Sequence, residues 1–367
     1  MNVLIQLCHP AHFHLYKNVA KSMMKDGHKI YILIKTKDIL EDLLKQSGLP
    51  YCNILKEAHR KSKIGVFCDL LLRDWRMLRF VKKKHIDLLT GSTVEVAQVG
   101  WLTNKYRVNT GEDDMRVVPL VQKLGGPFIQ TILSPIVCDN WKLESKSVKY
   151  ASYHELAYLH PNHFYADRHV VEQYFSVDTP YFILRFSSLD AHHDTGIKGI
   201  SFEIAQNLIE ILKPHGRIYI TSERELEPQF EPYRIKINTL DMHHVMAFAD
   251  LYIGDSQTMA AEAGVLGVPF VRFNDFVGLI GYLNELENVY HLGYGIKASE
   301  SGSAGKMYGV VREILSLPNR KEEWQTRRQK MLSEKIDYAQ FLTWFIENYP
   351  ESRKIMKENP DYQFRFK

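Results

Sequence analysis

The sequence has 367 residues, of which 45% are hydrophobic and 25% charged, a balance that excludes disordered and fibrous proteins. This length favours two domains, and no apolar run approaches the ~20 residues of a membrane-spanning helix. Residues 1–8 lack the basic leader and cleavage site of a signal peptide, so we expect a cytoplasmic protein. The four cysteines lack metal-type spacing and are expected to be reduced thiols.

The first part of the chain alternates short apolar runs with segments of helical periodicity. Strands are expected at residues 3–7, 28–34, 51–55, 86–90 and 107–109. Helices are expected from about 15 to 26 and at 37–46, 66–84 and 94–103. Strands that alternate with helices in this way predict an α/β fold with a doubly wound parallel sheet.

Residues 117–161 are less regular and end in a Tyr/His-rich run, so we expect a domain junction after them. A second alternation follows, with strands at 181–186, 217–221, 251–253 and 270–273, and helices at 200–212, 242–248, 305–315 and 321–335. The sequence therefore predicts Rossmann-like domains at 1–165 and 166–335. A helical tail at 336–367 is expected to pack back on the first domain.

Residues 250–273 read as strand, tight turn, helix, tight turn and strand. Asp255 or Ser256 is expected to cap the helix, and Gly267 to end it. Thr258 and Glu262 are four residues apart and so share one helix face. Because the first amides of a helix favour an anion, this turn is a candidate phosphate site. The alternative is that the cap is only a cap.

Polar side chains follow nearly every predicted strand, at the edge where parallel sheets bind ligands. They are His9, His12 and His14; Ser92 and Thr93; Glu112, Asp113 and Asp114; Arg185, Ser187, Ser188, Asp190, His192, His193 and Asp194; Thr221, Ser222, Glu223 and Arg224; and Ser256, Gln257 and Thr258. The adjacent His192 and His193 cannot easily face one ion, so no metal site is expected. No Gly-x-Gly-x-x-Gly follows the first strand, so no dinucleotide cofactor is expected either.

Basic residues are concentrated between Lys56 and Lys84. This segment has ten Lys or Arg and three acidic residues, a net charge of +7, whereas the rest of the chain carries −3. A stripe of apolar residues is expected on its helix, formed by Phe67, Leu70, Leu71, Trp75, Leu78 and Val81. The basic face is either simply solvated or a peripheral contact with an anionic membrane.

Several of these motifs together resemble a known family. They are His9-Pro10-Ala11-His12, Gly91-Ser92, Arg185 with His192-His193-Asp194, and Gly254-Asp255-Ser256-x-Thr258-Met259-x-x-Glu262 through Pro269. The combination resembles an uncharacterised family of archaea and bacterial surface-polysaccharide loci with a GT-B-type fold. It is more distantly similar to the non-hydrolysing UDP-N-acetylglucosamine 2-epimerases and to GT-B glycosyltransferases.

The resemblance implies two doubly wound domains that face a cleft, with the acceptor on the first and the nucleotide sugar on the second. The turn at Ser256–Thr258 would hold the diphosphate and Glu262 the ribose hydroxyls, while Glu112 falls near an epimerase carboxylate. The expected catalytic residues are His12, Glu112 and Asp113, one of which deprotonates the acceptor hydroxyl. The expected nucleotide-sugar ligands are His9, Ser92, Arg185, Ser222, Ser256, Gln257, Thr258 and Glu262.

Departures from the epimerase pattern keep three functions open. Gln257 and Thr258 stand where the epimerases have two glycines, and Arg185-Phe-Ser-Ser-Leu-Asp190 stands near the place of their His-Arg-Glu-Asn run. The first expectation is glycosyl transfer from a nucleoside diphosphate sugar, in particular a UDP-sugar, to a glycan or lipid-linked acceptor. The substrate would be the only nucleotide needed, with no metal, because helix amides and an arginine can neutralise a diphosphate. The alternatives are a UDP-sugar 2-epimerase and a non-catalytic nucleotide-sugar-binding protein, with no nucleic-acid partner in any case.

Overall fold

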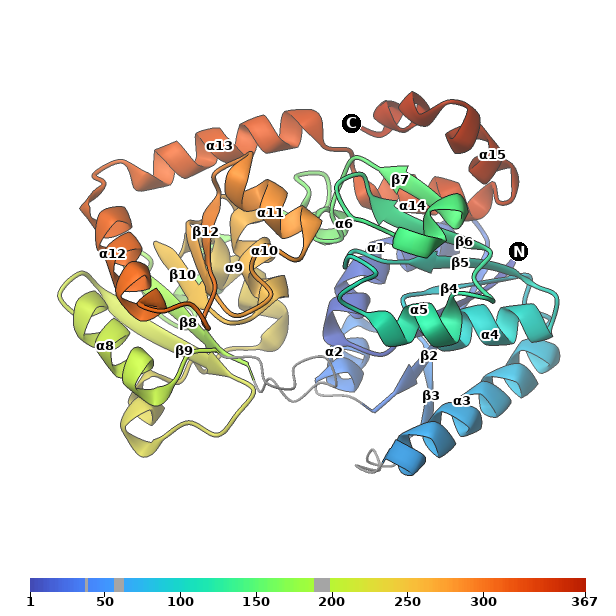
Figure 1. The fold of residues 1–367 in the computed structure, drawn as a ribbon, viewed down its shortest axis with the longest axis horizontal. Coiled ribbons are helices and arrows are strands. Elements are labelled where there is room, and N and C mark those ends of the chain that lie inside the picture. The colour runs from blue at the N-terminus through green and yellow to red at the C-terminus, as the bar shows by residue number, and fades with distance from the viewer. Residues whose placement is uncertain (37–38, 56–62, 188–198) are drawn as a thin grey trace. The chain divides into compact units, whose positions relative to one another are not determined.

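A computed structural model describes residues 1–36, 39–55, 63–187 and 199–367 (Figure 1). The predicted site residues Ser188, Asp190, His192, His193 and Asp194, and the charges at 56–62, lie outside them. The chain forms two compact units, one of residues 1–163 with 335–367 and the other of residues 164–334. The junction expected after residue 165 thus lies close to His163, and the tail belongs to the first unit.

The first unit contains a sheet of seven parallel strands in the order β3-β2-β1-β4-β5-β6-β7. Its strands are β1 (Asn2–Leu7), β2 (Lys29–Lys35), β3 (Tyr51–Leu55), β4 (Leu88–Gly91), β5 (Tyr106–Thr110), β6 (Thr131–Pro135) and β7 (Ser147–Tyr150). Its helices are α1 (Pro10–Lys25), α2 (Leu40–Ser47), α3 (Lys63–Lys84), α4 (Val94–Leu102), α5 (Pro119–Gly125), α6 (Leu156–Leu159), α14 (Tyr338–Glu347) and α15 (Glu351–Glu358). The 3-10 helices η1 (Trp141–Lys146) and η4 (Pro360–Phe366) complete it.

The strand order reverses direction after β3, and this reversal distributes the helices. Right-handed crossovers place α1 and α2 on one face of the sheet and α3, α4 and α5 on the other. The tail covers the first of these faces, where α14 packs against α1 and α6 (Figure 1). Strand β1 is buried from Val3 to Leu7, so the core of this unit lies on both faces of the sheet.

The second unit contains five parallel strands in the order β12-β11-β10-β8-β9. The strands are β8 (Tyr181–Phe186), β9 (Arg217–Ser222), β10 (Leu251–Gly254), β11 (Phe270–Phe273) and β12 (Gly293–Ile296). The helices are α7 (Arg168–Glu172), α8 (Phe202–Leu212), α9 (Met242–Phe248), α10 (Gln257–Leu266), α11 (Gly281–Asn288), α12 (Ser303–Ser316) and α13 (Arg320–Glu334), with 3-10 helices η2 (Pro228–Tyr233) and η3 (Thr239–Asp241). The predicted pair of doubly wound parallel sheets is confirmed.

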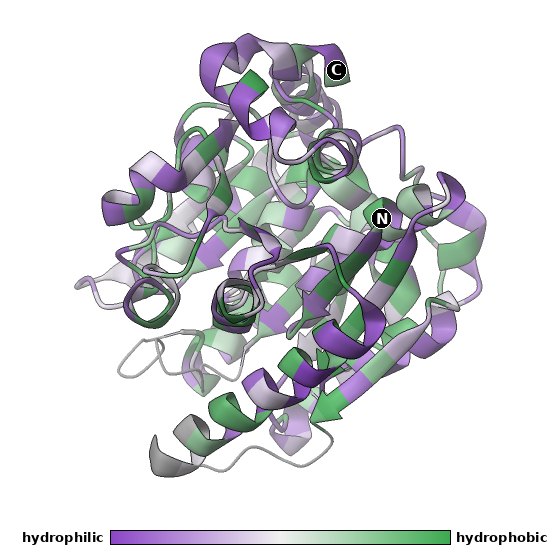
Figure 2. Cartoon of the chain, turned by 90° about the vertical axis from the view of Figure 1, so that its right-hand side faces the viewer, coloured by the Kyte–Doolittle hydropathy of each residue, from purple (hydrophilic) through white to green (hydrophobic). Residues whose placement is uncertain are grey.

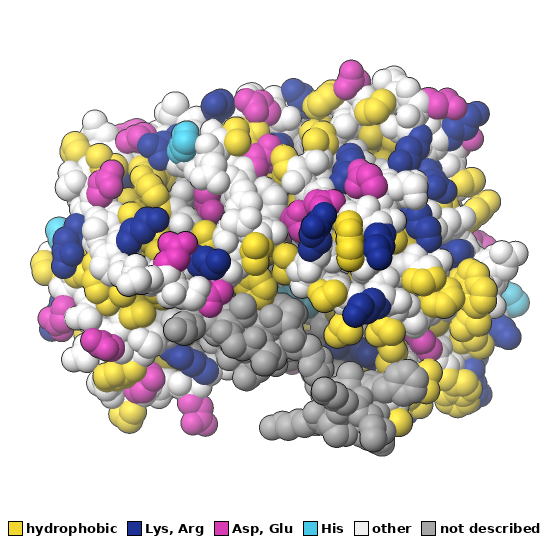
Figure 3. All heavy atoms as spheres, in the orientation of Figure 1, with side chains coloured by type: hydrophobic (Ala, Val, Ile, Leu, Met, Phe, Trp, Pro, Cys, Tyr) yellow, Lys and Arg dark blue, Asp and Glu magenta, His cyan; other side chains and the backbone are white. Residues whose placement is uncertain are grey.

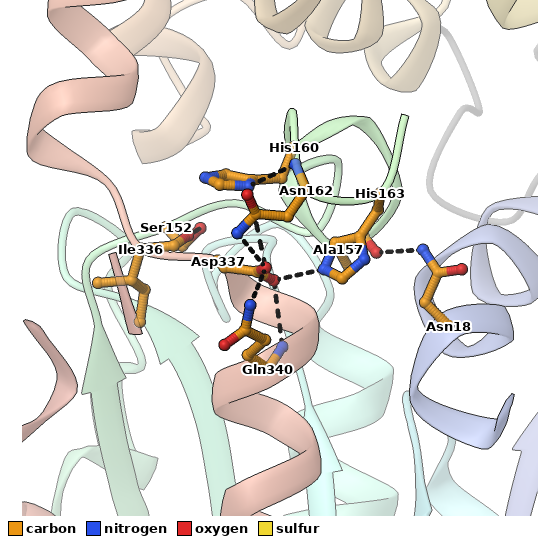
Figure 4. Close-up of polar contacts among 9 residues, drawn as sticks. All are labelled: Asn18, Ser152, Ala157, His160, Asn162, His163, Ile336, Asp337 and Gln340. Atoms are coloured by element: carbon orange, nitrogen blue, oxygen red, sulfur yellow. Dashed lines mark hydrogen bonds and ion pairs between the residues drawn. The ribbon is translucent and has the colours of Figure 1, made fainter. Parts of the chain in front are cut away.

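The chain leaves and re-enters the first unit beside one buried carboxylate, Asp337 (Figure 4). Its oxygens accept hydrogen bonds from Asn162 Nδ2 at 3.0 Å, His163 Nε2 at 2.7 Å, and both the backbone N–H and the side-chain amide of Gln340 at 3.1 and 2.9 Å. Asp337 also caps the start of α14. We call these four residues the Asp337 cluster. It ties the segment before the second unit to the segment after it.

Candidate functional site

In the first unit, residues that follow β1, β4 and β5 gather at one edge of the sheet, because these strands are adjacent and parallel. His9 is the N-cap of α1, and its Nδ1 accepts the N–H of Ala11 at 3.2 Å. Ser92 Oγ lies 2.8 Å from Thr110 Oγ1, which also lies 3.2 Å from the hydroxyl of Tyr16. The strand ends that precede the predicted residues His9, Ser92 and Glu112 are therefore adjacent in the sheet.

His12 lies in the first turn of α1 with a defined tautomer. The backbone N–H of Cys8 can only donate, and it points to His12 Nδ1 at 3.4 Å. The proton of the neutral ring must then be on Nε2, which makes that atom a hydrogen-bond donor. Burial, followed by the charges of His9, His154 and Lys35, lowers the pKa of His12 to about 3. The ring is therefore neutral at ordinary pH.

Glu112, which follows β5, is held by a residue that the sequence did not single out. The backbone N–H of His154 donates to Glu112 Oε1 at 2.6 Å, and the ring Nδ1 lies 3.3 Å from Oε2. Burial, and next the neighbouring Glu155 carboxylate, raises the pKa of Glu112 well above its ordinary value. Cys138 Sγ donates to the Glu112 carbonyl oxygen at 2.9 Å. Glu112 thus lies in a buried acid and histidine cluster.

His154 and Glu155 belong to the Tyr/His-rich run that ends the less regular segment at residues 117–161. They follow β7, so they too lie after a strand of the same sheet. Asp113, the neighbour of Glu112, is exposed, whereas Glu155 is 2% exposed. The rule that polar residues after a parallel strand are candidate site residues would have identified both. It could not be applied because β7 was not predicted.

In the second unit, Arg185 stands at the end of β8 beside Gly254 of β10. Its guanidinium donates to Thr221 Oγ1 at 2.9 Å and to the carboxylate of Glu223, both after β9. A Cβ at residue 254 would lie 2.8 Å from that of Arg185, so this close packing of strands requires glycine. Arg185 therefore brings a cation to the carboxyl edge of the sheet, next to the turn into α10.

The turn from β10 into α10 has the predicted chemistry. Ser256 is the N-cap and its Oγ accepts the N–H of Met259 at 3.4 Å, while Gly267 ends the helix with a positive φ of 76°. Gln257 and Thr258 occupy the first turn, whose amides have no acceptor within the helix. Backbone N–H groups at such a helix start can stabilise an anion.

Three further predicted residues form hydrogen bonds near the carboxyl edge of the second unit's sheet. The carboxylate of Asp255 accepts the N–H groups of Ser187 at 2.7 Å and Ile200 at 3.2 Å. Ser222 Oγ accepts the N–H of Arg224 and so shapes the turn after β9. Glu262 is buried, and its Oε1 lies 2.9 Å from His243 Nε2 of α9.

Metal-type donor sets are absent from the part of the chain that the structure describes, since no three His, Cys, Asp or Glu side chains there converge on one point. The four cysteines all lie among the described residues, and none of them forms a disulfide. Within the same residues, no helix combines the length and apolarity needed to cross a bilayer.

Two doubly wound parallel-sheet units with polar groups at the carboxyl ends of their strands define a GT-B-type fold. The chain belongs to the family described as "Protein of unknown function (DUF354)", whose model matches residues 1–291. A search of curated proteins finds no match.

Solved structures with this fold agree over nearly the whole chain at low sequence identity. Neisseria meningitidis UDP-GlcNAc 2-epimerase bound to UDP-GlcNAc has a TM-score of 0.64 and 13% identity, with 94% of this chain and 99% of that chain covered. The UDP co-structure of S. aureus MnaA has a TM-score of 0.66 and 10% identity, covering 96% and 97%. The spinosyn rhamnosyltransferase SpnG with its aglycone has a TM-score of 0.60 and 14% identity, covering 95% and 100%. The predicted resemblance to epimerases and glycosyltransferases is confirmed.

Proposed function

We propose that this protein transfers a sugar from a nucleoside diphosphate sugar, in particular a UDP-sugar, to a hydroxyl acceptor in surface-glycan assembly. The observation that carries the proposal is the position of Arg185 at the sheet edge, opposite Gly254 and so beside the turn into α10. A guanidinium and helix amides together neutralise a diphosphate leaving group. Solved structures of the same fold hold UDP-GlcNAc, UDP and an aglycone, which supports this substrate class.

The acceptor would be activated at the acid and histidine cluster of the first unit. Glu112 and His12 both lie at its sheet edge, and a base there would take the acceptor proton. The epimerase alternative is supported by the same cluster, because epimerisation also needs groups that move a proton or stabilise a detached sugar.

Product analysis separates the candidate functions. The purified protein is incubated with UDP-sugars, with and without glycan or lipid-linked acceptors, and the products are resolved by mass spectrometry and NMR. Release of UDP that requires an acceptor supports transfer. A changed sugar without acceptor indicates an epimerase, and binding without any product indicates a binding protein.

Replacement of Glu262 by alanine is expected to weaken UDP binding by about 1–3 kcal/mol, from loss of hydrogen bonds to a charged group. Glu262 lies one turn below Thr258 on α10, where ribose hydroxyls would follow a diphosphate at the turn. Calorimetry measures the affinity. Glu322→Ala, on an exposed position of α13, is the matched control. Unchanged affinity in a folded Glu262→Ala protein would remove Glu262 from the donor site.

We also propose that α3 meets the inner face of an anionic membrane, where a lipid-linked acceptor would lie. The apolar stripe predicted on α3 is divided between two faces of the helix. Leu71 is 52% and Trp75 53% exposed, whereas Val81 is buried, as is Met77 outside the stripe. Figure 2 shows hydrophobic residues recurring along this helix, which begins at a grey segment, and Figure 3 shows apolar atoms gathered over α3 and α4. The sheet needs only one face of α3, so the rest of its apolar surface faces outward.

The outward face of α3 combines these apolar side chains with cations. The Arg79 guanidinium lies 4.8 Å from the ring centre of Trp75, and Lys82 and Lys83 are exposed one turn further on. The two described acids of the helix are not exposed, because Asp69 is buried and Asp74 half-buried. Arg73 is turned inward to Glu95 at 3.0 Å. The exposed charge described on α3 is therefore positive, which complements an anionic lipid surface.

Vesicle co-sedimentation tests the α3 face. We expect salt-sensitive binding to phosphatidylglycerol vesicles and little binding to phosphatidylcholine, at roughly 1 kcal/mol for each engaged Lys or Arg. Lys82→Glu with Lys83→Glu should abolish binding, and Trp75→Ala should weaken it. The control pair Lys213→Glu with Lys330→Glu makes the same charge change at exposed positions of the second unit. Equal binding to both lipids, or an equal effect of the control pair, would contradict the proposal.

A further inference from the structure

The hydrogen positions around Glu112 follow from its neighbours. Glu155 forms a hydrogen bond with Glu112, and both groups are buried or nearly so. Two buried carboxyl groups in contact hold one proton between them, because their like charges disfavour full ionisation. We infer that this proton lies in the hydrogen bond between the two carboxyl groups. The Glu112 oxygen that faces the imidazole of His154 therefore offers only lone pairs, and the ring must supply the hydrogen from Nδ1.

A neutral imidazole with its hydrogen on Nδ1 has its lone pair on Nε2. His154 Nε2 is buried and has no hydrogen-bond partner among the described residues. The ring is fixed against Tyr338, with centroids 5.6 Å apart and planes 16° apart, and 15% of the side chain remains exposed. Buried polar atoms are almost always hydrogen-bonded. The open lone pair is available to a group that the described residues do not supply.

In His12 the ring hydrogen is on the other nitrogen. Its Nδ1 receives the Cys8 N–H, so its Nε2 carries a hydrogen and donates. The two rings are close enough for their charges to interact. One cluster therefore presents a nitrogen that accepts a hydrogen and a nitrogen that donates one. A hydroxyl group matches both, since it can donate to His154 and accept from His12.

We propose that His154 is the base that takes the proton of the acceptor hydroxyl, that Glu112 positions its ring, and that His12 holds the hydroxyl oxygen. This inference rests on the proposed sugar transfer. In that step the hydroxyl oxygen forms a bond to the anomeric carbon. The bond from that carbon to the diphosphate oxygen breaks, and its electron pair leaves with the diphosphate. The hydroxyl proton moves to His154 Nε2, where the single negative charge of the Glu112–Glu155 pair balances the new cation.

The His154 ring is neutral in the resting site. Burial lowers the pKa of His154 to about 3, so the ring is unprotonated and its lone pair is available at ordinary pH. Several charged or titratable groups surround the two histidines and Glu112, and they include His9, Lys35, Asp113, Glu155, Cys8, Cys138, Tyr150 and Tyr338. Of these, the Glu112–Glu155 pair is the one joined to His154 through its Nδ1.

Nitrogen NMR of the full chain labelled with 15N-histidine tests the hydrogen positions directly. Signals are assigned with His12→Gln and His154→Gln variants. We expect His154 to carry its hydrogen on Nδ1 and His12 on Nε2, and a His154 hydrogen on Nε2 would overturn the proposal. Glu112→Gln should weaken the preference for the Nδ1 hydrogen, because both Glu112 oxygens face His154 donors and the amide has only one oxygen. Glu112→Met, which lacks the oxygens, should lose it.

Turnover gives the second readout. His154→Gln should lower kcat by about 10²- to 10⁴-fold, the usual contribution of a general base, with unchanged UDP affinity. The control is His169→Gln, at a side chain that is 90% exposed. Full turnover of His154→Gln would show that another group takes the proton. If the unaltered protein transfers no sugar, the proposed function fails, and the NMR measurement still decides the arrangement of the two histidines.

Discussion

Replacing Asp337 by alanine is expected to lower the free energy of unfolding of the first unit by about 3–5 kcal/mol, the usual cost of removing one partner from a buried charged network. The side chain is 0% exposed, so water cannot replace its hydrogen bonds. The change leaves His163 and Asn162 without their acceptor and removes the cap of α14. Differential scanning calorimetry should show the loss in the transition of the first unit. An equal shift for Asp361→Ala, an exposed acid in the same unit, would contradict this.

The same residue predicts a pH dependence. Burial alone would raise the pKa of Asp337, but hydrogen bonds and charge from His163, with hydrogen bonds from Gln340 and Asn162, outweigh it and hold the pKa below its ordinary value. A lowered pKa in the folded state stabilises the protein above the ordinary value of about 3.9, and the gain is lost as pH falls through the folded value. The destabilisation caused by Asp337→Asn should therefore shrink below about pH 4, when measured by urea unfolding.

The second large effect concerns the buried ion pair of Arg272 and Glu287 in the second unit. Arg272 is fully buried, and its Nε donates to Glu287 Oε1 at 2.9 Å. Arg272→Met should cost about 3–5 kcal/mol because it leaves a buried carboxylate unpaired. The double variant Arg272→Met with Glu287→Met should recover most of this loss, since no unpaired charge remains. Urea unfolding of the two single variants and the double variant measures the coupling.

The sign of the pH effect provides an independent check on Arg272→Met. Burial raises the pKa of Glu287, and the charge of Arg272 opposes that rise. Without Arg272 the folded carboxyl binds its proton more tightly than the unfolded one, whose pKa is about 4.3. Since the pKa of Glu287 is already raised when Arg272 is present, the loss of stability relative to the unaltered protein should increase as pH rises through that raised value. A pH-independent loss would indicate packing damage instead of an unpaired charge.

The sequence predicted those parts of the fold whose local pattern agrees with their environment. The strands and helices up to residue 110 appear close to the expected positions because apolar runs and helical periodicity alternate there. The turn at Ser256 and the stop at Gly267 follow from cap chemistry alone, and both are present.

Missed elements are those set by tertiary contacts. Strand β12 contains two glycines, which disfavour a strand, yet a Cβ at Gly293 would lie 2.4 Å from the Phe270 ring and one at Gly295 would lie 2.4 Å from Glu287. Strand β7 has only four residues and no apolar run. Because β7 was missed, His154 and Glu155 had no predicted neighbours, although Glu112 was identified. Helix periodicity likewise located α3 but did not show which of its apolar side chains face outward.

The Asp337 cluster makes the second unit separable. His163 and Asp337 touch at 2.7 Å, so the two ends of the first unit's interrupted chain already meet where the second unit is inserted. A short link from His163 to Lys335 would delete residues 164–334 and keep α14 in place on α1. Residues 164–334 are themselves one continuous segment with its own sheet. We therefore expect genetic excision to yield a host and an insert that each fold alone, whereas truncation after residue 163 would remove part of the host's own core.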